Sequence, residues 1–96
     1  MSKITYTNGF SVVKTLQRAA ADPRVIEIEG NGMEEGRVFI HLRPGYVFSL
    51  SECSCRSVGS AREVRETMAS IMTREEFENS SLHPGRTVYY LSINWR

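Results

Sequence analysis

Residues 36–72 read GRVFIHLRPGYVFSLSECSCRSVGSAREVRETMASIM, and this stretch decides the fold. Strict alternation of apolar and polar residues predicts a strand over 37–43. The core face of that strand is expected to consist of Val38, Ile40 and Leu42. Pro44 and Gly45 suit the centre of a type II turn, and a second strand is expected over 46–50. The stretch therefore predicts two strands joined by a Pro-Gly turn.

A helix is predicted to follow, because Ser60 and Glu63 have the spacing of a capping box. Its buried face is expected to consist of Ala61, Val64, Met68 and Ile71. Thr73 and Glu76 repeat the capping chemistry. They predict either a short final helical turn through Phe77 or an extension of the first helix.

The segment before residue 36 predicts a strand, a helix and a second strand. The first strand covers 3–7 and is expected at a sheet edge; the helix begins near Phe10 and ends at Asp22-Pro23. The helix has a buried stripe at helical spacing, formed by Phe10, Val13, Leu16 and Ala20. The strand over 24–29 is expected to bury Ile26 and Ile28. The solvent-exposed face of this strand is expected to carry Glu27 and Glu29.

The segment 86–96 predicts a final strand, rich in β-branched and aromatic residues and paired within a sheet. One face of it is formed by Thr87, Tyr89, Leu91, Ile93 and Trp95. The expected order is strand, helix, strand, strand, strand, helix, strand. This order predicts one small α+β domain over 1–96, with a mainly antiparallel or mixed sheet of four or five strands and two helices on one face. A loosely ferredoxin-like plan and a plainer antiparallel sheet under two helices both fit.

Composition excludes several classes of function. A net charge of +1 gives no whole-molecule attraction to nucleic acid or to an anionic membrane. No apolar run approaches the roughly 18 residues of a membrane span, and no secretory signal is visible. Cys53 and Cys55 barely reach the four ligands of a zinc site even when both His41 and His83 are counted. We expect a cytoplasmic protein with reduced thiols, no metal and no cofactor.

The best surface candidate lies on the face of strand 37–43 that points away from the helices. It carries Arg37, Phe39, His41 and Arg43. Arg62, with Arg56 and Arg65, adds positive charge near the start of the second helix. Exposed rings beside arginines are used by RNA-binding sheets, so single-stranded nucleic acid is an alternative ligand.

No catalytic motif is present, because no serine has a nucleophile-elbow context and no glycine cluster has that of a phosphate loop. The primary expectation is therefore a non-enzymatic protein that binds a protein partner or itself. Its size is typical of accessory, inhibitory or immunity factors, including phage- and plasmid-encoded ones. Binding is expected through the sheet face or through an exposed strand edge, at 3–7 or 86–96. A small enzyme without a recognisable motif is the further alternative.

Overall fold

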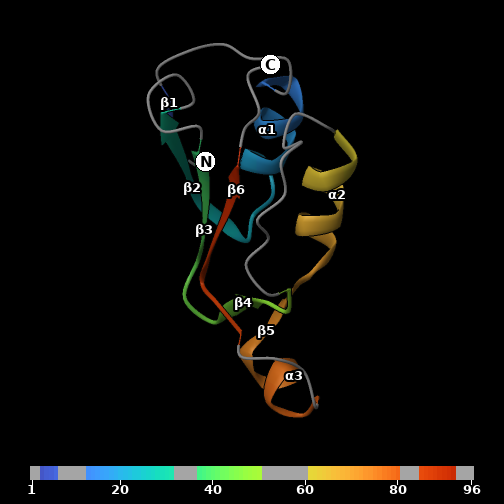
Figure 1. Cartoon of the computed structure of the whole chain (residues 1–96). Coiled ribbons are helices and arrows are strands. Elements are labelled where there is room, and N and C mark those ends of the chain that lie inside the picture. The colour runs from blue at the N-terminus through green and yellow to red at the C-terminus, as the bar shows by residue number, and fades with distance from the viewer. Residues whose placement is uncertain (1–2, 7–12, 32–36, 51–60, 81–84, 93–96) are drawn as a thin grey trace.

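The protein has the α+β architecture that the sequence predicts, with helices packed on a sheet (Figure 1). The computed structural model describes residues 3–6, 13–31, 37–50, 61–80 and 85–92. Within these ranges the strands are β1 (Lys3–Tyr6), β2 (Val25–Asn31), β3 (Arg37–Leu42), β4 (Tyr46–Phe48), β5 (Ile71–Thr73) and β6 (Val88–Ser92). The helices are α1 (Val13–Ala20), α2 (Ala61–Ala69) and α3 (Arg74–Glu78).

The main sheet has four strands in the order β1-β2-β3-β6. Strands β1 and β2 are parallel, whereas β3 is antiparallel to both β2 and β6, so the predicted mixed sheet is confirmed. The expected edge position of the first strand is also confirmed among the described strands. In a ferredoxin-like sheet another strand separates the two strands of each crossing. Here β1 and β2 are neighbours, so the strand order differs from that plan.

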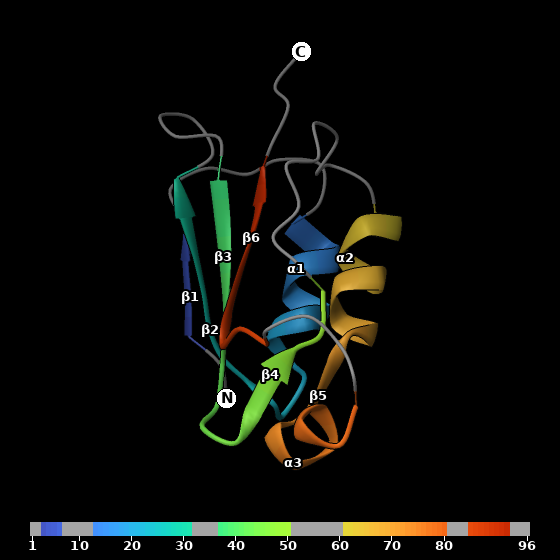
Figure 2. The ribbon, with the colours of Figure 1, turned by 60° about the horizontal axis from the view of Figure 1, so that its bottom comes forward.

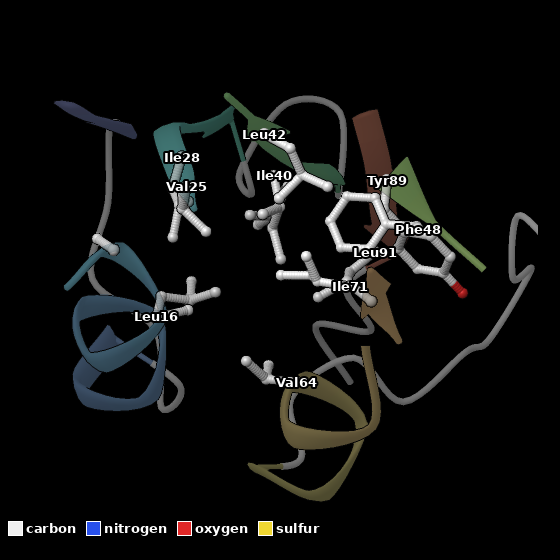
Figure 3. Close-up of a cluster of buried hydrophobic side chains, with 13 residues drawn as sticks. Leu16, Val25, Ile28, Ile40, Leu42, Phe48, Val64, Ile71, Tyr89 and Leu91 are labelled. Atoms are coloured by element: carbon white, nitrogen blue, oxygen red, sulfur yellow. The ribbon is translucent and has the colours of Figure 1, made fainter. Parts of the chain in front are cut away.

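Helices α1 and α2 cover one face of this sheet, as predicted (Figure 2). Figure 3 shows Leu16 of α1 and Val64 of α2 pointing toward the strands. The main cluster of buried side chains is formed by Leu16, Ala19, Ala20, Val25, Ile28, Val38, Ile40, Leu42, Phe48, Val64, Ile71, Tyr89 and Leu91. The predicted core face of β3 is thus confirmed in full.

Strand β2 departs from the predicted alternation at a β-bulge. Val25 pairs with Leu42 but Glu27 pairs with His41, so Ile26 is an extra residue on β2. Ile26 is 43% exposed, whereas Val25 and Ile28 are fully buried. The prediction that Ile26 lies in the core was therefore wrong. The bulge lets Val25 replace it there.

The Pro-Gly turn is confirmed, but the hairpin is not. Gly45 has a φ of 94°, as a type II turn requires at its third position, and the Tyr46 N–H donates to the Arg43 carbonyl at 3.3 Å. Strand β4 nevertheless pairs with β5 in a separate two-stranded sheet. Because both Val47 and Phe48 are fully buried, β4 lacks the solvent-exposed face that a strand of a surface hairpin has.

The segment after α2 forms β5, which was not predicted, and then the short helix α3, which is one of the two predicted alternatives. The prediction that Ile71 lies on the second helix was wrong, because α2 ends at Ala69 and Ile71 begins β5. Thr73 caps α3: its hydroxyl accepts from the Glu76 N–H at 3.1 Å. The Glu76 carboxylate accepts in return from the Thr73 N–H at 3.2 Å. The capping box predicted at Ser60 lies outside the described residues.

Candidate functional site

The face of the main sheet opposite α1 and α2 carries the candidate site. Side chains alternate along a strand, and Ile28, Ile40 and Tyr89 point into the core. Their strand neighbours therefore point the other way, where no helix of the described part of the chain packs (Figure 2). We call this surface the open face; its described side chains are Glu27 and Glu29 of β2, Phe39 and His41 of β3, and Val88 and Tyr90 of β6. All six are half-buried by their neighbours.

An aromatic pair forms one part of the open face. Phe39 and Tyr90 are register partners across β3 and β6. Their ring centroids are 6.2 Å apart and the ring planes are inclined by 51°. This tilted arrangement is one that aromatic rings favour electrostatically. The two rings therefore hold each other in place while part of each remains accessible.

A hydrogen-bonded histidine–glutamate pair lies beside the aromatic pair. The His41 Nε2 atom is 2.6 Å from the Glu29 Oε1 atom, and the side chains are 26% and 43% exposed. The contact is diagonal, because the register partner of His41 is Glu27 and that of Glu29 is Phe39. The pair thus fixes the imidazole next to Phe39.

Of the five predicted binding residues, the structure brings Phe39 and His41 together. Arg43 follows β3 and its Nε donates to the Pro23 carbonyl at 2.7 Å, so its guanidinium is held at the corner before β2. The backbone of Arg37 pairs with Asn31 and Ser92, and its side chain lies outside the described set.

Arg62 is separate from the other predicted residues. It lies on α2, on the opposite side of the sheet (Figure 2), with an 81% exposed side chain. Its Nε is 3.0 Å from the Glu66 Oε1 atom in an i,i+4 pair. Such pairs on an exposed helix surface contribute little. Arg62 is therefore not part of the open face.

Sequence reasoning did not assign Glu27, Glu29 and Tyr90 to the same site as Phe39 and His41. Alternation predicts that Glu27 and Glu29 share the solvent-facing side of their strand and that Tyr90 lies on the opposite side of its strand from Tyr89. The grouping of these residues depends on strand order and register. The two carboxylates change the electrostatics of the surface. The face predicted to be basic and aromatic is mixed in charge over its described residues.

The described residues contain no group of three or more His, Cys, Asp or Glu side chains that could hold a metal ion. Cys53, Cys55 and His83 lie outside the described ranges. None of the helices in those ranges is long and apolar enough to cross a membrane.

The chain matches no protein-family model, and neither a curated protein nor a solved structure is significantly similar to it. Its function must therefore be inferred from the geometry of its own residues.

Proposed function

We propose that the protein acts without catalysis, by binding a protein partner through the open face. The observation that carries this proposal is the half-buried Phe39–Tyr90 pair beside the hydrogen-bonded His41–Glu29 pair. The partner is proposed to be met in the cytoplasm, in keeping with the expectation from sequence.

The composition of the open face supports a protein ligand. Aromatic residues are enriched at protein interfaces, and Tyr is among the residues that dominate binding energy. Phe39 and Tyr90 already restrain each other, so ordering them on binding costs little conformational entropy. Their neighbours His41 and Glu29 are hydrogen-bonded to each other through Nε2 and Oε1, so these two atoms stay paired when a partner covers them.

The charges of the open face favour a protein over nucleic acid. Glu27 and Glu29 stand on the strand next to Phe39 and His41, where carboxylates would repel phosphates. Arg43 already donates to the Pro23 carbonyl. A mixed-charge surface instead suits a partner that presents both signs.

The proposal is tested by affinity capture with a double variant, Phe39→Ala with Tyr90→Ala. Lysate of the native host is passed over immobilised protein with and without nuclease, and retained proteins are identified by mass spectrometry. Removal of the aromatic pair is expected to weaken partner binding by about thirtyfold or more, as for interface hot spots. The matched control is Arg62→Ala with Glu66→Ala, which removes an exposed ion pair on α2 and should bind normally.

Circular dichroism and thermal unfolding establish that both double variants are folded. Sedimentation over a concentration series shows whether the partner is a second copy of the chain. If the folded Phe39 and Tyr90 variant captures the same protein as strongly as the control does, the open face is not the binding surface.

A charge-reversal variant separates protein from nucleic acid. Glu27→Lys leaves the aromatic pair in place but replaces a carboxylate with an ammonium group. A nucleic-acid binder would gain affinity for single-stranded oligonucleotides at low salt, because one phosphate contact is added. We expect the wild-type chain and this variant to leave oligonucleotides unretained. Retention that rises in the variant and falls with salt would instead favour nucleic acid.

A further inference from the structure

A pocket of about 240 Å³ lies between α1 and α2, in the helical layer that covers the sheet. It is lined by Thr15, Arg18, Ala19, Asp22, Val64, Arg65 and Met68. Figure 2 shows the two helices side by side, with the open face on the far side of the strands. The pocket is therefore separate from the surface proposed above.

The floor of the pocket is apolar. Val64 and Met68 stand one turn apart on α2, and Ala19 faces them from α1. Ala19 and Val64 are buried, and Met68 packs against the core. Because alanine is small, the two helices leave an unfilled space at this level. Methionine adds a flexible, polarisable wall that adapts to a ligand.

Two arginines with positively charged side chains are among the residues that line the pocket. Asp22 is neutralised by Arg24, whose Nη2 atom is 2.7 Å from the Asp22 Oδ2 atom. Arg18 of α1 and Arg65 of α2 are exposed, and neither makes an ion pair with another of the described residues. Two arginine side chains therefore line a pocket with an apolar floor. Arginine is well suited to bind a carboxylate through paired hydrogen bonds.

We propose that this pocket binds a small amphipathic monocarboxylate, with its short apolar chain on the floor and its carboxylate at the rim beside Arg18 and Arg65. The volume sets the size of the ligand. At about 30 Å³ per water-sized group, 240 Å³ accommodates about eight such groups. Hexanoate, a six-carbon chain that ends in a carboxylate, has this size and is the probe of choice.

The test is an NMR titration of the ¹⁵N-labelled full chain with hexanoate. Saturable shifts are expected at the backbone amides of Ala19, Val64 and Met68. Three further compounds separate the contributions of the apolar chain and of the negative charge to binding. The first, 1-hexanol, has the chain without the charge, hexylammonium has the opposite charge, and acetate has the charge without the chain. All three are expected to bind at least tenfold more weakly than hexanoate.

The variant Arg18→Gln with Arg65→Gln should bind hexanoate at least tenfold more weakly, whereas Arg62→Gln on the same helix should bind it normally. These substitutions lie at exposed positions, so the fold is expected to persist, and the amide spectrum itself reports this. Equal shifts with 1-hexanol, or undiminished binding by the double glutamine variant, would overturn the proposal. So would shifts at this pocket with an acidic peptide but none with hexanoate. Shifts confined to Phe39 and Tyr90 would place the ligand on the open face instead.

Discussion

At the scale of single residues, Asp22 organises the corner between α1 and β2. Its Oδ1 atom accepts from both the backbone N–H and the Nε–H of Arg24, each at 2.9 Å. Its Oδ2 atom accepts from the Arg24 Nη2 at 2.7 Å. The hydrogen bonds from the Arg24 side chain lower the pKa of Asp22 despite the opposing effect of burial. The charged carboxylate is thus the form that the folded state prefers.

This preference predicts how stability changes with pH. The pKa of Asp22 is lower in the folded chain than in the unfolded chain, where it is about 3.9. Its contribution is therefore fully present above about pH 4 and is lost as the pH falls through the folded value. Asp22→Asn should lower the free energy of unfolding by about 1 kcal/mol at pH 7, as expected for a partly exposed pair. That difference from the wild type should shrink below pH 4.

Urea unfolding at pH 7 and at pH 2.5 measures this difference. Glu78→Gln, which alters an exposed carboxylate of α3, is the control and should show little change at either pH. A deficit of Asp22→Asn that is as large at pH 2.5 as at pH 7 would contradict an electrostatic role for Asp22.

At the scale of elements, the spacing of apolar residues identifies most strands and helices. Bulges and strand pairing depend on contacts between residues far apart in the sequence. The alternation of β3 predicts its core face correctly because the strand is regular. The alternation of β2 fails at Ile26 because a bulge depends on the pairing partner. In the same way, β4 pairs with β5 rather than β3, and no local pattern shows this.

The bulge predicts that substitution by alanine lowers the free energy of unfolding by unequal amounts at the two isoleucines of β2. Ile28→Ala should lower the free energy of unfolding by about 2–5 kcal/mol, because it leaves a cavity under the helices. Ile26→Ala should cost less than about 1 kcal/mol, because that side chain is largely in solvent. Urea denaturation of the two variants measures the difference. Similar losses for both would mean that β2 alternates regularly through Ile26.

The capping box of α3 predicts how replacement of Thr73 changes the stability of the fold. Thr73→Ala removes the hydroxyl that accepts from the Glu76 N–H and should cost about 1 kcal/mol. Thr73→Ser keeps that hydroxyl and should retain most of the stability. Thermal unfolding compares the two variants. A serine variant as unstable as the alanine variant would show that the threonine methyl group, rather than the cap, matters.

At the scale of the whole molecule, Phe48 connects the small sheet to the main one. Its N–H donates to the Arg86 carbonyl at 2.6 Å, and its ring centroid lies 5.4 Å from that of Tyr89. The sequence predicts the α+β class and the helix-covered face, since both follow from amphipathic periods. It does not predict the grouping of Glu29, Phe39 and Tyr90, since this requires the register of β2, β3 and β6.

The two proposed sites occupy opposite layers of the molecule. The open face presents aromatic rings and a histidine–glutamate pair, whereas the pocket between α1 and α2 presents arginines over an apolar floor. A partner on the sheet therefore leaves the pocket accessible. Binding at one site can be measured while the other is occupied.

The central claim, that the open face is the binding surface, is tested most directly by cross-saturation NMR. The labelled chain is mixed with its captured, unlabelled partner, and irradiation of the partner attenuates signals of the residues that it touches. We predict the strongest attenuation at Phe39, His41 and Tyr90. Attenuation confined to α1 and α2, with the three open-face residues unaffected, would contradict the claim.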